Sequence, residues 1–387
     1  MEAIDRLRLL SQQMAFEPDS DLRPDGTPLV PSECLARRAD ELYVHPAVMP
    51  NGRRIRLLKT QLSSFCERDC RYCAFRTGRD FRRAAFAPEE FARLFLELHR
   101  RGIAEGLFLS SGLAGGSVRT QDRLIAVAEI LRLRFGYRGY LHLKIMPGAE
   151  RAQVERAMQL ADRVSVNLEA PNRSRLAQLA PHKAFEDELL TPLRWVEDVR
   201  RTQPAQRGWN GRWPSSTTQF VAGGSDESDL ELLQTTEYLY RLLRLQRAYF
   251  MAFSPVPDTP LETHPPTPPL RQLRLYQASF LLRDYGFSVE ELPFEADGRL
   301  PIQSDPKLAW AQKNLAGAPV EVNRAERLQL LRVPGIGPRG AEAILRARRE
   351  GRIRDLSALK KMGIWTERAA PFLLFDGRRA PVQPALF

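Results

Sequence analysis

The chain has 387 residues, of which 43% are hydrophobic and 27% are charged, which is typical of a soluble globular protein with one large and one small domain. Its first residues lack the uninterrupted apolar stretch of a signal peptide or membrane span, so we expect a cytoplasmic protein without a membrane partner. The net charge is +11, from 58 Lys and Arg against 47 Asp and Glu.

Residues 1–54 are predicted to form an N-terminal extension, with a short amphipathic helix at 4–14 followed by an irregular, proline-rich stretch. Cys34 lies in this stretch and is most simply a small buried apolar residue. A second hypothesis makes it a thiol that returns a hydrogen atom to a substrate radical. Residues 55–62 are apolar enough for a buried strand, which leads into a loop rich in cysteine.

Three of the four cysteines, Cys66, Cys70 and Cys73, fall within eight residues. Such spacing lets one loop turn three thiolates toward one place, and soft thiolates select iron–sulfur clusters or zinc. A closed zinc site needs four ligands, and no second Cys or His pair follows at zinc spacing. The pattern therefore favours a 4Fe-4S cluster with one iron left open to an outside ligand, with a zinc loop or uncoordinated thiols as alternatives.

After this loop, helix-like and strand-like segments alternate regularly as far as residue 253. Such alternation predicts parallel strands joined by helical crossovers. The strands number six, fewer than a closed eight-stranded barrel needs, so we predict an α/β fold with a partial (β/α)6 TIM-type barrel over residues 55–290. A doubly wound sheet is the alternative, although it would need a glycine-rich turn where the cysteines stand. The predicted strands are 55–62, 106–109, 140–146, 163–168, 217–221 and 247–253.

The Cys-x3-Cys-x2-Cys spacing, with the aromatic Tyr72 before the last cysteine, resembles the signature loop of the radical S-adenosylmethionine (SAM) enzymes. The resemblance implies a 4Fe-4S cluster whose open iron is chelated by the amino and carboxylate groups of SAM. It also implies an external one-electron donor, because reductive cleavage of SAM yields methionine and a 5′-deoxyadenosyl radical. The same resemblance implies the partial barrel, which the count of strands reaches separately.

Ligands of such barrels bind at the carboxyl ends of the strands, where polar residues gather in this sequence. The strand that ends at residue 109 leads into Ser110, Ser111 and Gly112, which stand where the family has a Gly-Gly-Glu type turn facing the methionyl amine. Asn167 and Glu169 alternate at the end of another strand and resemble the Asn-x-Asp pattern that holds the ribose of SAM.

Lys144 lies in an otherwise apolar strand, where a lysine facing the barrel needs an anion. We expect the SAM carboxylate to be that anion, and a structural ion pair is the alternative. Gly223 permits close backbone contact after the fifth strand and is expected to approach the adenine. Tyr72 is expected near the adenine by its resemblance to the family's aromatic residue.

Residues 291–320 are predicted to be an irregular linker, and residues 321–387 a separate basic domain. This last segment holds 14 Lys or Arg and 7 Asp or Glu, so 14 minus 7 gives +7 of the total +11. A basic excess confined to one segment indicates a polyanion-binding module or, alternatively, a solvated basic face.

Asn323 and Glu326 are typical of a capping box that opens a helix through Leu331. The glycine-rich turn that follows, at 333–341, leads to a second helix, and the whole resembles a helix-hairpin-helix motif. A shift of 28 places repeats it in residues 359–373, with Trp365 at the place of Gly337. We therefore expect the second copy to be a packing partner with a weakened phosphate site. The motif binds phosphate through backbone N–H groups. The predicted nucleic-acid residues are Gly335, Ile336, Gly337, Arg339, Gly340 and Lys360.

The combination of cysteine loop and C-terminal hairpins resembles a family of radical SAM proteins assigned to DNA modification or repair. The resemblance implies an enzyme that acts on nucleic acid, with DNA favoured over RNA. A non-catalytic DNA-binding protein with a structural or redox-sensing cluster is the alternative, and a protein-binding role is the alternative for the hairpins.

Overall fold

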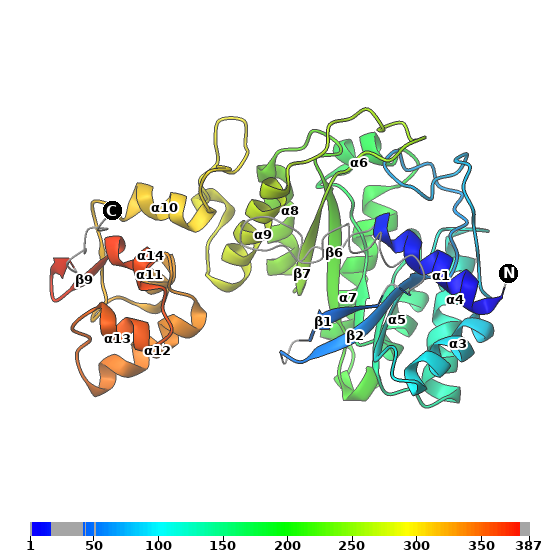
Figure 1. Ribbon diagram of the computed structural model, residues 1–387, viewed down its shortest axis with the longest axis horizontal. Helices are drawn as coiled ribbons and strands as arrows, with labels where there is room; N and C mark the ends of the chain where they lie inside the picture. Colours follow the sequence, from blue (N-terminus) through cyan, green and yellow to red (C-terminus); the bar gives the residue numbers. More distant parts are fainter. Residues whose placement is uncertain (1, 17–41, 43, 50–51, 380–387) are drawn as a thin grey trace. The chain divides into compact units, whose positions relative to one another are not determined.

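The computed structural model describes residues 2–16, 42, 44–49 and 52–379. The proline-rich stretch from residue 17 and Cys34 therefore lie outside the described residues. The chain divides into two compact units, an N-terminal unit of Met1–Glu227 with Tyr238–Gln272 and a C-terminal unit of Ser228–Glu237 with Leu273–Phe387 (Figure 1). Each unit has its own sheet.

The N-terminal unit contains an open, curled sheet whose strand order follows the chain from β1 to β7 (Figure 1). Strands β2 to β7 are parallel, which confirms the six predicted strands. The prediction missed β1, which pairs antiparallel with β2 and contains Pro46. Proline is tolerated there because an edge strand has a free side. The strands are β1 Val44–Val48, β2 Arg54–Gln61, β3 Gly106–Ser110, β4 Tyr140–Lys144, β5 Arg163–Ser165, β6 Ser215–Ala222 and β7 Arg247–Ala252.

Helices connect successive strands, and neighbours in the chain pack side by side, α3 on α4, α4 on α5 and α5 on α7. Their starts follow local sequence: Pro88 and two acids open α3, and a capping box of Glu150 with Gln153 opens α5. Short π-helical turns at Ile130–Arg134 and Phe185–Leu190 border α4 and α7. The helices are α1 Ala3–Gln12, α3 Pro88–Arg100, α4 Ser117–Glu129, α5 Arg151–Leu160, α6 Arg173–Leu179, α7 Thr191–Thr202, α8 Asp229–Leu242 and α9 Pro269–Asp284.

The two faces of the parallel sheet differ in polarity. Leu58, Leu107 and Leu141 lie in register on one face, and all three are fully buried. The next residue of each strand faces the other way, and there Phe108, His142 and Arg163 stand beside Lys59 in one row across the sheet. The polar face is therefore the side of the sheet available to a charged ligand.

The C-terminal unit packs short helices around an apolar core that includes Leu330, Leu331, Ile344 and Leu359. A three-stranded sheet of order β10-β9-β8 lies beside them. Its elements are α10 Pro306–Asn314, β8 Val320–Glu321, α11 Arg327–Arg332, α12 Pro338–Glu350, α13 Leu356–Lys361, α14 Thr366–Ala369, β9 Leu373–Phe375 and β10 Arg378–Arg379.

The structure differs from the predicted linker at 291–320, because α10 lies inside it. Asp305 accepts a hydrogen bond from the Leu308 N–H at 3.0 Å and Pro306 follows at the first helical position, a start signal that the prediction missed. Apart from Ser228–Glu237, the unit also begins earlier than predicted, at residue 273 rather than 321. Arg274, in the first half of α9, explains this, since its guanidinium donates to the Ile302 carbonyl and so connects α9 to the later chain.

The predicted cap of α11 is also wrong by three residues. Glu326, not Asn323, is the N-cap, and it forms its capping box with Gln329. Asn323 instead exchanges two hydrogen bonds with the backbone of Ile353, a residue 30 positions away. A tertiary contact has therefore taken the side chain that local sequence assigned to the helix.

The buried Lys307 predicts a pH dependence of stability. Its Nζ donates to the Ile336 carbonyl at 2.6 Å and lies 4.6 Å from the centre of the Tyr285 ring. Burial lowers its pKa to about 7, so above that value the folded unit binds this proton more weakly than the unfolded chain does. Stability of the C-terminal unit should therefore rise with pH between 7 and 10.5, by at most about 1.4 kcal/mol per pH unit.

Urea unfolding of the full chain, followed by tryptophan fluorescence at several pH values in that window, measures the slope. Lys307→Met should lose it, because methionine has no proton to bind. Parallel pH curves for the parent and the variant would contradict the assignment.

Candidate active site

The cysteine loop follows directly on β2, at the carboxyl end of the parallel sheet. None of Cys66, Cys70 and Cys73 is part of a disulfide, and Cys70 is buried while the other two are half-buried. The Phe75 N–H points to the Cys73 Sγ at 3.4 Å. The loop contains no helix or strand, so its backbone depends on neighbouring segments for hydrogen bonds.

Arg83 closes the loop from one side. Its guanidinium donates to the carbonyls of Ser64, before the first cysteine, and of Phe75, after the last. It also donates to the carbonyls of Arg76 and Arg79. Burial lowers the pKa of Arg83, while the nearby Cys66 and Cys73 act in the opposite direction. The sequence analysis did not identify Arg83, because no sequence pattern links an arginine ten residues beyond the last cysteine to the cysteine loop.

A second attachment joins the loop to the segment after β3. The Glu67 N–H donates to the Leu113 carbonyl at 2.7 Å, and its carboxylate accepts from the Gly115 and Gly116 N–H groups. Gly112 lies so close to the loop that an added Cβ would stand 2.2 Å from the Phe65 carbonyl oxygen. Only glycine permits this approach.

On its other side the loop is attached to the segment after α6. The Arg71 N–H donates to the Leu179 carbonyl at 2.7 Å, and Asp69 pairs with His182 at 2.7 Å. Arg68 donates to the His182 carbonyl and forms an ion pair with Glu188. Residues between the cysteines thus position the loop.

Three polar side chains, those of Lys183, Glu169 and Tyr72, lie against Cys70. Lys183 pairs with Glu169 at 3.2 Å, and both side chains are 8% exposed. Lys183 also hydrogen-bonds the thiol of Cys70, and Tyr72 hydrogen-bonds Glu169. Glu169 was predicted as a SAM residue, but Lys183 was not, because it lies in an irregular segment 14 residues later.

The ionisation of this group follows from its burial. Desolvation raises the pKa of the Cys70 thiol, and Lys183 opposes that effect. Desolvation alone would lower the pKa of Lys183, yet Cys70, Glu169 and Cys73 outweigh it, so that the pKa lies above its ordinary value. Lys183 is therefore a cation held beside the cysteine loop.

The residues present fit a 4Fe-4S cluster. Three cysteines that form no disulfide lie on one loop, two of them half-buried, and Lys183 supplies a compensating positive charge. Among the residues that the structure describes, no three His, Cys, Asp or Glu side chains meet closely enough to ligate a single ion. Cluster ligands need no such meeting point, because each thiolate binds a different iron.

The predicted SAM residues of the β3 segment lie directly against the cysteine loop. Ser110 is buried, and its carbonyl accepts from the Leu62 N–H at 2.8 Å. The Ser111 hydroxyl donates to the carbonyl of Gly112 at 2.7 Å. The Gly112 N–H donates to the Ser63 carbonyl at 2.7 Å, so much of the polar backbone expected to meet SAM is used within the chain.

Lys144 is half-buried at the end of β4, opposite Ser165 of β5. Asn167 is half-buried beyond the end of β5. The prediction that Asn167 and Glu169 alternate on one extended strand is wrong, because β5 ends at Ser165 and Glu169 has φ +65°. A side chain at this φ leaves the strand direction, which brings Glu169 to Tyr72 and Lys183.

Gly223 has φ +91°, and a Cβ there would lie 1.9 Å from the Thr267 hydroxyl oxygen. Its N–H donates to the carboxylate of the buried Glu227, and its carbonyl contacts His264 Nε2 at 2.8 Å. Contacts within the chain therefore explain this glycine without a ligand. Its predicted approach to adenine stays a prediction.

In the C-terminal unit, the predicted phosphate-binding turn joins α11 to α12. Gly335 has φ +84°, and a Cβ there would lie 2.4 Å from the Trp365 carbonyl oxygen. Gly337 is the N-cap of α12, without a side-chain hydrogen bond. Arg339 and Lys360 are exposed, and Gly340 is half-buried.

Ile336, predicted as a nucleic-acid residue, has a fully buried side chain, its N–H donates to the Val333 carbonyl and its carbonyl accepts from Lys307. Its contact with nucleic acid stays a prediction. In the second hairpin Trp365 is 58% exposed, and its carbonyl oxygen is the atom that an added Cβ at Gly335 would meet.

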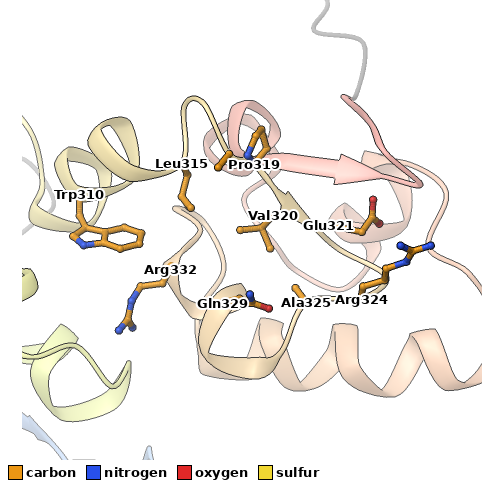
Figure 2. Close-up of a pocket in the computed structure, with 10 residues that line it drawn as sticks. Trp310, Leu315, Pro319, Val320, Glu321, Arg324, Ala325, Gln329 and Arg332 are labelled. Carbon is orange, nitrogen blue, oxygen red and sulfur yellow. The ribbon is translucent and has the colours of Figure 1, made fainter.

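A cavity of about 350 Å³ lies in the same unit (Figure 2). Arg332, at one side, is held by the carbonyls of Tyr285 and Gly286 and by the carboxylate of Glu291. None of the residues predicted from sequence to bind nucleic acid lines this cavity. Its lining is Trp310, Leu315, Ala318, Pro319, Val320, Glu321, Arg324, Ala325, Gln329 and Arg332.

Comparison with known proteins supports the assignment of the cysteine loop. Residues 60–198 match the model of the Radical SAM superfamily. Over these residues the chain is therefore similar to the radical SAM proteins. Members of this superfamily use a 4Fe-4S cluster and SAM. The match begins in β2, includes all three cysteines and ends within α7.

Similar solved structures share little sequence with the chain. Methylornithine synthase is 15% identical, with a TM-score of 0.46 over 59% of this chain and 61% of its own. The FeFe-hydrogenase maturase HydG from Carboxydothermus hydrogenoformans is 14% identical, with a TM-score of 0.45 over 59% and 51%. A radical SAM methyltransferase from Sphaerobacter thermophilus is 15% identical, with a TM-score of 0.44 over 71% and 85%.

The chain thus covers only 51% to 61% of the lengths of the first two of these proteins. At these TM-scores the structural similarities support no conclusion about activity or substrate. No curated protein matches the sequence. In the part of the chain that the structure describes, no helix is long and apolar enough to span a membrane.

The contact between Gly112 and the cysteine loop predicts a sensitive position. Gly112→Ala should push the Phe65 carbonyl away and destabilise the N-terminal unit by about 1–3 kcal/mol. Reconstituted protein should then bind less iron per chain, measured together with thermal unfolding. Gly317→Ala is the control, because an added Cβ there meets nothing within 4 Å. Full iron content and unchanged stability in Gly112→Ala would disprove the contact.

Proposed function

We propose that this protein is a radical SAM enzyme that acts on nucleic acid, with DNA favoured over RNA, in its modification or repair. The observation that carries the first part is the loop with Cys66, Cys70 and Cys73, which is attached to the chain on both sides and has none of its cysteines in a disulfide. The second part rests on the charge of the sheet and of the C-terminal unit. Free thiols beside a cluster need a reducing compartment, so we place the protein in the cytoplasm.

When bound, a 4Fe-4S cluster supplies the electron that cleaves SAM to a 5′-deoxyadenosyl radical, after reduction by an external donor. The side chains of this protein would hold the cluster and orient SAM. Cys66, Cys70 and Cys73 would hold three irons, and Arg83 and Glu67 keep the loop in one conformation. Glu169, Asn167 and Lys144, at the carboxyl end of the sheet, are the side chains we assign to SAM.

The charge of the barrel supports a phosphate-bearing substrate. Within the described structure, strands β2 to β7 contain no Asp or Glu. Lys59 and Arg163 stand in one row of the polar face, and Lys144 and Arg247 stand in the next. A sheet face of one charge sign attracts the opposite charge, and a nucleic acid carries a phosphate at every nucleotide.

The C-terminal unit supports a role in holding nucleic acid. The turn at Gly335 and Gly337 opens α12, whose first N–H groups have no capping side chain. A helix of 13 residues with such a start favours an anion at its N-terminus, and the net charge of +7 in residues 321–387 acts in the same direction. Backbone contacts of this kind bind phosphate without reading bases.

Reductive cleavage of SAM tests the first part of the proposal. Anaerobically reconstituted and reduced protein should convert SAM to 5′-deoxyadenosine, detected by mass spectrometry, and Cys70→Ala should not. SAM that leaves the spectrum of the intact cluster unchanged would support the alternative, a non-catalytic protein with a structural or redox-sensing cluster.

A pair of variants separates the two halves of the function. In Gly337→Val, the side chain should crowd the α12 N-terminus and the Tyr285 hydroxyl, which an added Cβ already meets at 3.3 Å. Binding of all nucleic-acid sequences should weaken about equally, while SAM cleavage without nucleic acid persists. Cys70→Ala should show the reverse pattern. Nucleic-acid affinity in Gly337→Val equal to that of the parent would rule out the turn as the phosphate site.

The substrate itself is found by isotope transfer. Deuterated single-stranded and double-stranded DNA and RNA are each incubated with unlabelled SAM and the reduced protein. A true substrate should pass deuterium into 5′-deoxyadenosine, because the radical abstracts hydrogen from it. Transfer from none of the four nucleic acids would contradict the proposal.

A further inference from the structure

The buried ion pair of Lys183 and Glu169 has no explanation in stability alone. Removing two charges from water costs several kcal/mol per ion, and a buried pair is often no more stabilising than apolar residues of the same size. Here both side chains are 8% exposed, and their nitrogen and oxygen atoms lie 3.2 Å apart. The position of the pair beside Cys70 therefore indicates a chemical role rather than a stabilising one.

The backbone holds Glu169 in a conformation that few residues with a side chain adopt. Its φ is +65°, a region costly to residues other than glycine. Two hydrogen bonds to β6 keep it there, from the Glu169 N–H to the Gln219 carbonyl at 2.9 Å and from the Val221 N–H to the Glu169 carbonyl at 2.7 Å. The hydrogen bonds to β6 thus hold the Glu169 carboxylate in place, and the ion pair with this carboxylate positions the Lys183 ammonium group.

Lys183 is the charged side chain that hydrogen-bonds a cysteine of the loop. Its ammonium group contacts both Glu169 and the thiol of Cys70, the most buried of the three cysteines. Reduction potentials of iron–sulfur clusters depend on net charge, on hydrogen bonds to sulfur and on solvent exposure. Lys183 acts on the first two, since it adds a positive charge and donates to the sulfur.

We propose that Lys183 is a positioning residue that sets the reduction potential of the cluster through Cys70, with Glu169 as the counterion that limits its effect. A cluster gains negative charge on reduction, so a nearby cation favours the reduced form. A carboxylate at the same place opposes it. This inference rests on the cluster site alone and makes no assumption about the substrate or the C-terminal unit.

The two members of the pair should therefore act in opposite directions. Lys183→Met keeps most of the side-chain length, removes the positive charge and leaves the carboxylate unopposed, so reduction becomes harder. Glu169→Gln keeps the shape and leaves the lysine unopposed, so reduction becomes easier. Lys183→Arg keeps the charge and should stay near the parent. A role limited to packing would not produce opposite signs from neighbouring residues.

The test is a redox titration of the reconstituted full chain, followed by electron paramagnetic resonance, without SAM and without nucleic acid. Lys183→Met should lower the midpoint potential by about 59 mV or more, which is a tenfold less favourable one-electron reduction. Glu169→Gln should raise it. Lys307→Met is the matched control, because it removes a buried lysine that contacts Ile336 and Tyr285 and should leave the potential unchanged.

Iron and sulfide per chain are measured for each variant, so that loss of the cluster is not mistaken for a shift. A fully loaded Lys183→Met at the parent potential would overturn the proposal, as would equal shifts for Lys183→Met and Lys183→Arg. If Lys183→Met takes up no iron, the Glu169→Gln variant provides the test instead. A midpoint potential of Glu169→Gln that does not rise above that of the parent overturns the proposal. The titration contains neither SAM nor nucleic acid, so its outcome is read separately from SAM cleavage and nucleic-acid binding, which the variants of the previous section test.

Discussion

The structure of the N-terminal unit depends on holding a loop without secondary structure at the carboxyl end of a sheet. Every polar group of such a loop needs a partner, and here the partners come from both sides. Glu67 connects the loop to the segment after β3, and Asp69 and Arg71 connect it to the segment after α6. Because these residues lie between the cysteines, the same short stretch supplies both the ligands and the supports that position them.

The contacts of the cysteine loop restrict the residue types and backbone conformations of the neighbouring segments. Gly112 is required by the Phe65 carbonyl of the cysteine loop, which lies too close for any side chain. Glu169 adopts a left-handed backbone conformation that aims its carboxylate at Lys183 beside Cys70. Costly backbone and buried charge thus occur together at the place where the chemistry of the domain resides, as expected where function opposes stability.

The C-terminal unit shows how a functional pattern can have a structural cause. Its glycine turn is typical of phosphate binding, yet Gly335 is needed because the carbonyl of Trp365, in the second hairpin, lies against it. Ile336 lies in the core, and its carbonyl accepts from the buried Lys307. The proposal that this turn binds the phosphates of nucleic acid therefore depends on the N-terminus of α12 and on the positive charge of the surrounding residues, and not on the glycines by themselves.

The sequence determined the features that repeat or that lie close together in the chain. The alternation of apolar and helical segments predicted six parallel strands, because each strand and crossover leaves a local pattern. The Cys66–Cys73 spacing predicted the cluster ligands, since one loop carries all of them. The predicted bounds of the six strands were within about three residues of those observed, whereas the edge strand β1 and the helix α10 were missed.

Only the tertiary structure decided which distant residues complete the site. Lys183 meets Glu169 and Cys70 because α6 and the turn after it return the chain to the cysteine loop, and no spacing in the sequence encodes that return. Asn323 left its predicted cap for Ile353 for the same reason, a partner 30 residues away. Local patterns specify backbone conformation and ligand type, whereas the pairing of buried charges depends on how the whole chain packs.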